Sequence, residues 1–108
     1  MNLVKVNKVL ANEIRFKILF WLKEPEKHFP TQNIKGNYDD GVCVQYIGQK
    51  SGLSLSTISH YLSMMQKAEL LVSSRFGKWT YYKRNEEGIF NYVNSLKEHL
   101  LLDEINIT

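Results

Sequence analysis

The hydrophobic residues of the chain recur mainly at helical spacing. Leu3, Val6 and Leu10 mark one face of a short amphipathic helix near the N-terminus. Asn12 is a suitable N-cap for a second helix, which we expect to end near Lys23. The apolar stripe of that helix consists of Ile14, Ile18, Leu19, Trp21 and Leu22. A stripe of this width predicts that the second helix packs on a core.

The central stretch from Gln45 to Ala68 predicts two helices separated by a tight turn. Gly52 can adopt the positive φ that ends the first helix, and Ser54 can cap the second. The second helix has apolar positions at Ile58, Leu62 and Met65 and outward positions at Ser56, Thr57, Ser59, His60 and Ser63. One buried stripe behind a face of short hydrogen-bonding side chains is typical of a helix-turn-helix whose second helix enters a DNA major groove. The alternative is an ordinary helical pair with a solvated, serine-rich face.

A β-hairpin is predicted directly after this helical pair. Leu70 to Phe76 and Trp79 to Lys83 are rich in strand-forming residues, and the Gly77-Lys78 pair between them favours a turn. Arg75 and Lys78 flank the tip, where the wing of a DNA-binding domain reaches the phosphate backbone or the minor groove. Basic residues at a hairpin tip can also serve only to protect a solvated edge.

Asn85 can cap a last helix with a long apolar stripe. Its positions are Ile89, Val93, Leu96 and Leu100. Together with Leu3, Val6 and Leu10 of the first helix, this stripe predicts a homodimer interface, with two DNA-contacting helices about 34 Å apart. The alternative is that both terminal helices only close the core of one chain.

The segment between the second helix and the helical pair is expected to be irregular. Residues 24–41 are polar and contain Pro25, Pro30 and Gly36, which predicts a long surface loop. Such a loop can be functional or a tolerated insertion, and both possibilities stay open. Val42 to Val44 is a short apolar run that favours a small strand.

The length and composition indicate one domain, residues 1–108, of mainly α class with a β-hairpin wing, that is, a winged helix-turn-helix (α+β). Hydrophobic residues make up 44% and charged residues 23% of the chain. No apolar run approaches the roughly 20 residues of a membrane span, and the N-terminus lacks the apolar region of a secretory signal. We therefore expect a cytoplasmic protein without a membrane partner.

Positive charge is concentrated in the middle of the chain. Residues 1–40 hold seven basic and five acidic side chains, residues 41–84 hold six basic and one acidic, and residues 85–108 hold one basic and five acidic. The net charges are +2, +5 and −4. The segment with the predicted helix-turn-helix and wing is therefore the one that suits a polyanion such as double-stranded DNA.

Candidate chemistry is sparse. The sequence has no recognisable pair of catalytic carboxylates, no nucleophile with a base and no phosphate-binding loop, so neither an enzyme nor a cofactor is expected. The single cysteine, Cys43, is either a small buried hydrophobic residue or a lone sensing thiol. His28 and His99 are expected to be solvated rather than metal ligands. A winged-helix module that binds another protein instead of DNA is the alternative function, although it leaves the acid-poor middle segment unexplained.

Three stretches resemble the ArsR/SmtB family of winged helix-turn-helix repressors. Residues 10–19, LANEIRFKIL, resemble the family's LADPTRLRIL; residues 52–62, GLSLSTISHYL, resemble GLSQSTVSRHL; and residues 75–82, RFGKWTYY, resemble the wing sequence REGRWVYY. The resemblance implies a homodimer built through the first and last helices, which binds a palindromic operator and leaves it when an inducer arrives. The expected DNA contacts are Ser54, Ser56, Thr57, Ser59, His60, Ser63, Arg75 and Lys78.

The chain departs from the family at its sensing and recognition positions. Gln45 stands where a Cys-Val-Cys metal box would have its second cysteine, and one thiolate does not chelate a soft metal. The last helix has only His99 with Asp103 four residues later, which is not the family's zinc-sensing pattern. Leu55 replaces the usual glutamine and His60 the usual arginine, which predicts a changed operator preference. No residue pattern identifies the inducer.

Overall fold

The computed structural model describes residues 1–30 and 38–101. In chain order their elements are α1 (Leu3–Leu10), α2 (Glu13–Lys23), α3 (Pro25–His28), β1 (Val42–Cys43), α4 (Val44–Ser51), α5 (Leu55–Lys67), β2 (Leu71–Phe76), β3 (Trp79–Arg84) and α6 (Glu86–Leu100). The α4–turn–α5 pair is followed directly by the β2–β3 hairpin, so the predicted winged helix-turn-helix is confirmed.

Short polar side chains cap the starts of three helices, and a glycine ends a fourth, as predicted. Asn12, Ser54 and Asn85 cap α2, α5 and α6, and each accepts a hydrogen bond from the backbone N–H three residues on, at 3.0, 3.2 and 3.2 Å. Gly52 has φ 72° and ends α4 in the left-handed conformation. These local interactions make the turn between α4 and α5 short and fix where α5 begins.

The three strands form one antiparallel sheet in the order β1-β3-β2. Phe76 lies opposite Trp79 at the tip of the β2–β3 hairpin, and Leu71 lies opposite Arg84 at its base. The short strand β1 pairs with the middle of β3 through Val42 opposite Tyr82 and Cys43 opposite Tyr81. Because α4 begins at the residue after β1, this pairing attaches the helix-turn-helix directly to the wing.

The core lies between α2, α4, α5 and the base of the sheet. Its buried members are Ile18, Trp21, Leu22, Phe29, Val42, Ile47, Ile58, Leu62, Met65 and Leu71. Ile58, Leu62 and Met65 have no exposed surface, as the apolar stripe of α5 predicts. Helix α5 is therefore anchored along one side and presents its other side outward.

The segment 24–41 differs in part from the predicted surface loop. Pro25 begins the short helix α3, because a proline fits the first helical position, where no N–H partner is needed. Phe29 follows α3 and is buried in the core, and the partly buried Tyr38 packs against this core. Residues 31–37 of the predicted loop lie outside the described residues.

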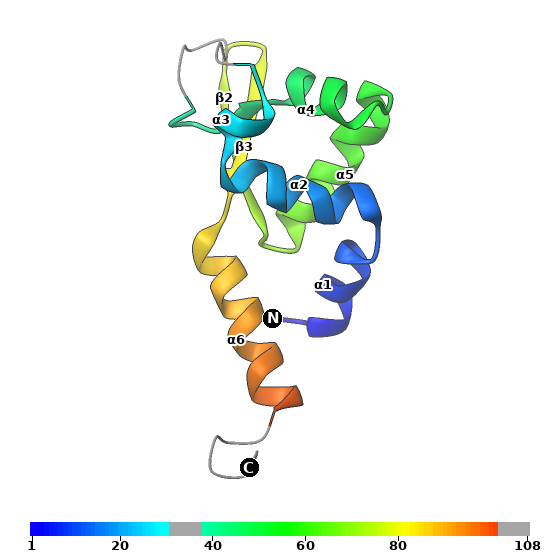
Figure 1. The fold of residues 1–108 in the computed structure, drawn as a ribbon, viewed down its shortest axis with the longest axis vertical. Helices are drawn as coiled ribbons and strands as arrows, with labels where there is room; N and C mark the ends of the chain where they lie inside the picture. Colours follow the sequence, from blue (N-terminus) through cyan, green and yellow to red (C-terminus); the bar gives the residue numbers. More distant parts are fainter. Residues whose placement is uncertain (31–37, 102–108) are drawn as a thin grey trace.

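Helix α6 extends away from the rest of the chain and lies beside α1 (Figure 1). The two helices are joined by a hydrogen bond from the Tyr92 hydroxyl to Asn7 Oδ1. Large apolar side chains of both are left exposed, including Val4, Phe90, Val93 and Leu100. Apolar surface of this extent on two neighbouring helices is typical of an interaction surface.

One predicted interface residue belongs to the core of the single chain. Val6 is only 3% exposed, because the face of α1 that carries it is turned inward within the chain. Leu3, Leu10, Ile89 and Leu96 are half-buried. Val93 and Leu100, at 56% and 75% exposure, are the predicted interface residues with the most free surface.

Candidate nucleic-acid interface

The outer face of α5 carries the polar residues that the sequence predicts there. Ser56, Ser59 and His60 are exposed, whereas Thr57 and Ser63 are half-buried. With Ile58 buried on the opposite side, these five side chains are presented as a group by a helix whose inner face is packed. The arrangement matches the size and polarity that a major groove accepts.

Ser54 is engaged within the helix start. Its hydroxyl donates to Thr57 Oγ1 at 2.9 Å and accepts from the Thr57 backbone N–H at 3.2 Å. Of the predicted contact residues, Ser54 therefore serves first to order α5. Thr57 keeps its own hydroxyl hydrogen available as a donor.

Helix α5 is braced against α2 by a polar cluster outside the core. The Arg15 guanidinium lies 4.6 Å from the centre of the Tyr61 ring and donates through Nε to the Val9 carbonyl at 2.6 Å. Asn12, the cap of α2, donates through Nδ2 to the Tyr61 hydroxyl at 3.4 Å. These contacts restrain the rotation of α5 about its axis, which decides which side chains face outward.

The wing carries both predicted basic residues at its tip. Arg75 and Lys78 are exposed. Arg75 donates through Nε to the Gly77 carbonyl at 3.1 Å, and Lys78 Nζ lies 5.2 Å from the centre of the Trp79 ring. The two cations are therefore held close to the tip by local contacts and keep donors directed to solvent.

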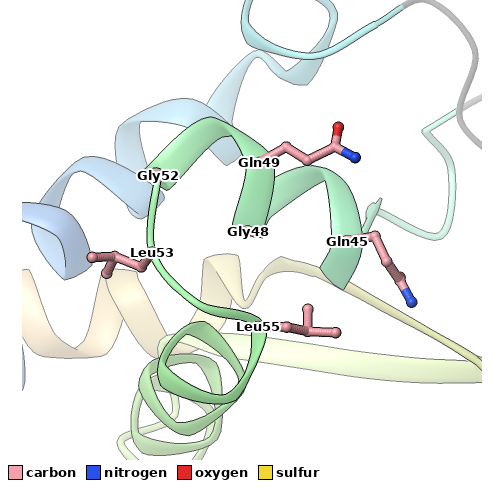
Figure 2. Close-up of a pocket in the computed structure, with 6 residues that line it drawn as sticks. All are labelled: Gln45, Gly48, Gln49, Gly52, Leu53 and Leu55. Carbon is pink, nitrogen blue, oxygen red and sulfur yellow. The ribbon is translucent and has the colours of Figure 1, made fainter.

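An open hollow of about 400 Å³ lies between α4 and the first turn of α5 (Figure 2). It is lined by Gln45, Gly48, Gln49, Gly52, Leu53 and Leu55. The two glutamines extend outward from α4, and Leu55 extends from the start of α5. From the sequence, Gln45 is predicted only as a missing metal ligand, and Gln49 has no predicted role. Their i, i+4 spacing on one helix face was the signal that could have identified them.

Cys43 contacts Gln45 at the entrance to α4. Its side chain has no exposed surface, and its Sγ donates to Gln45 Oε1 at 2.6 Å. Burial raises the pKa of the thiol above its ordinary value, which disfavours the nucleophilic thiolate. Of the two predicted roles, the geometry favours the small buried residue over the reactive thiol.

Cys43 should react with a thiol reagent at least about tenfold more slowly in the folded protein than in the unfolded chain. Folding raises the pKa of the Cys43 thiol, so the thiol stabilises the folded chain only while it stays protonated in the unfolded chain as well. The free energy of unfolding should therefore fall as the pH rises above the pKa of the unfolded chain, where only the unfolded chain loses the proton. Labelling with a chromogenic disulfide at pH 8, with and without urea, measures the ratio. Equal rates in the two states would mean that Cys43 is an accessible thiol.

Potential metal ligands are dispersed. Within residues 1–30 and 38–101, no three histidine, cysteine or acidic side chains form a cluster that could hold a metal ion. His99 is exposed, with ring Nδ1 2.7 Å from the Ser95 carbonyl, and the His28 ring packs edge-on against Phe20. Asp103, which follows His99 by four residues in the sequence, lies outside the described residues. Among the helices that the structure describes, none is long and apolar enough to cross a membrane.

Two proteins with similar sequences are named as transcriptional regulators. The chain is 45% identical over 101 residues to an uncharacterised HTH-type transcriptional regulator, YbzH, of Bacillus subtilis, and the match covers 93% of this chain and all of the relative. Over 50 residues it is 40% identical to a putative arsenical resistance operon repressor, ArsR2, of Halobacterium salinarum, which covers 46% of this chain and 42% of the relative. No family model matches the chain.

The fold is also found among solved structures. A homodimeric winged helix-turn-helix DNA-binding domain of a possible ArsR-family regulator from Mycobacterium bovis superimposes with a TM-score of 0.59 at 24% identity, over 92% of this chain and 81% of that one. This likeness supports the winged fold, and the near full-length match to the Bacillus protein carries the assignment. The chain belongs to the HTH-type transcriptional regulators and has the winged helix-turn-helix fold, and 46% of it is similar to a putative ArsR repressor.

Proposed function

We propose that residues 1–108 act as one unit that binds a palindromic operator as a homodimer and represses transcription by occupying it, without catalysing a reaction. The observation that carries the proposal is that Ser56, Ser59 and His60 are exposed on the outer face of α5, in a chain whose wing also has two exposed cations. We place the protein in the cytoplasm, where chromosomal DNA lies in prokaryotes such as the sources of the two similar proteins.

In this proposal the two surfaces have different tasks. The α5 side chains Ser56, Thr57, Ser59, His60 and Ser63 contact base edges and nearby phosphates in the major groove. Arg75 and Lys78 contact the backbone from the wing, where their charge supplies affinity without sequence selectivity. Ser54 supports the group by capping α5.

The dimer is supported by two observations. The Mycobacterium bovis domain with this fold is homodimeric, and the α1 and α6 surface of this chain exposes Val93 and Leu100. A two-fold axis through this surface repeats α5 in the partner, so that each copy contacts one half-site of a palindrome. We also assign the half-buried residues Leu3, Leu10, Ile89 and Leu96 to the proposed interface.

His60→Ala and Lys78→Ala should separate the two tasks. We expect His60→Ala to lower the preference for a selected operator over random duplex DNA, because it removes a base contact in the major groove. Lys78→Ala should weaken binding to all duplexes alike and lower the slope of log affinity against log salt by about one unit, because one phosphate contact is lost. Fluorescence anisotropy at several salt concentrations measures both effects.

Lys97→Ala is the matched control, because it removes an exposed lysine on α6, away from the wing. It should leave the salt slope unchanged. Identical behaviour of His60→Ala and Lys78→Ala on operator and random DNA would contradict the division of tasks. Absence of any duplex binding at low salt would instead favour a protein-interaction module.

A further inference from the structure

The hollow between α4 and α5 contains an exposed apolar side chain that the core does not require. Leu55 is the first residue of α5 and is 50% exposed, whereas Ile58, one turn later, is completely buried. The N-terminal residues of the second helix in a helix-turn-helix are those that contact base edges. The position of Leu55 therefore brings an apolar group to the place where bases are distinguished.

The same hollow supplies hydrogen-bond donors. Gln45 and Gln49 extend from α4 and Leu55 extends from the start of α5, and all three line the hollow (Figure 2). Gln45 Oε1 accepts the Cys43 thiol hydrogen, and the side-chain nitrogen of Gln45 points away from α4 (Figure 2). An apolar side chain and an amide donor thus line one site.

Among the four bases, only thymine presents a matching edge in the major groove. Thymine carries the C5 methyl group next to the O4 acceptor, whereas cytosine presents the N4 donor, which cannot pair with an amide NH₂ group. We infer that Leu55 contacts the methyl group of a thymine in each operator half-site and makes the protein select thymine there. This inference rests on the proposed operator-binding function and names one of the bases that it recognises.

The expected size of the effect follows from one methyl group. Removing a buried methyl contact should weaken binding about fourfold per half-site. A weakening of about fourfold is a small part of the binding free energy of a DNA complex, but it is larger than the error of a binding titration. It is also specific to one atom group of the DNA, so it separates a methyl contact from a general loss of binding.

A deoxyuridine scan tests the inference, because uracil is thymine without its methyl group. The duplex is selected from a random pool with the wild-type protein, and each thymine is then replaced by deoxyuridine at equivalent places in both half-sites. We expect one such pair of positions to weaken wild-type binding about fourfold per half-site. Leu55→Ala should bind the two duplexes equally, and Leu55→Met, which keeps an apolar contact, should still distinguish them.

Val72→Ala is the matched control, since Val72 is a 37% exposed apolar residue on β2, outside the hollow. It should respond to deoxyuridine as the wild type does. If no replacement weakens wild-type binding, or if Leu55→Ala keeps the full sensitivity, the thymine contact is excluded while operator binding stands. If the wild type binds no duplex at low salt, the proposed function itself fails and the inference fails with it.

Discussion

Val93→Asp should convert the proposed homodimer into a monomer and lower operator affinity by at least about 100-fold. Val93 lies on α6 with 56% of its surface exposed, beside further exposed apolar residues such as Phe90. A carboxylate placed in the interface would lose its hydration without gaining a partner charge. Once the two chains separate, each α5 binds its half-site independently, and the advantage of linked binding is lost. Light scattering after size-exclusion chromatography and anisotropy with operator DNA measure the two effects.

Asn91→Asp adds the same charge to the same helix and serves as the control. Asn91 is exposed and lies on the opposite side of α6 from Leu100. The variant should remain dimeric and bind DNA nearly as the wild type does. A Val93→Asp protein that is still dimeric, with normal affinity, would show that the chains associate through another surface.

Gly88→Ala should destabilise the protein by about 1–3 kcal/mol, although glycine-to-alanine changes within helices usually stabilise. A Cβ atom at Gly88 would lie 1.8 Å from the Glu69 carbonyl oxygen, so the backbone of α6 or of the turn after α5 must shift. Asn85 fixes this contact further, because its Nδ2 donates to the same carbonyl at 3.0 Å. Urea unfolding followed by circular dichroism gives the change in the free energy of unfolding.

The sign of the Gly88→Ala result decides between two effects. Helix propensity alone predicts a gain of up to about 1 kcal/mol, and the contact with Glu69 predicts a loss. Asn91→Ala, at an exposed position of the same helix, should show only the propensity effect. A gain in stability at Gly88 would mean that α6 can move away from the turn without cost, and that its angle to α5 is not set there.

Local features of the fold were predictable because they depend on neighbouring residues. The caps at Asn12, Ser54 and Asn85 and the end of α4 at Gly52 each involve residues within about one helical turn, so the helix boundaries matched closely. The buried stripe of α5 followed from spacing alone. The same spacing left the polar face outward, which is why the proposed DNA contacts could be named from the sequence.

Features that join distant segments were not predictable in this way. Val6 has the spacing of an exposed dimer residue, but the inward orientation of α1 buries it. The segment after Lys23 appeared to be only a loop, yet Phe29 enters the core. Gln45 and Leu55 are ten positions apart and carry no shared motif, and they line one hollow because the turn at Gly52 folds α4 against α5.

The sequence by itself determined the order of elements, the helix caps, the segregation of positive charge and the family resemblance, because each of these is a property of adjacent or regularly spaced residues. Only the tertiary structure decided which apolar residues remain exposed for a partner, that Cys43 is buried against Gln45, and that Leu55 faces the hollow beside α4. These depend on the relative placement of helices, which arises from packing between residues far apart in the chain.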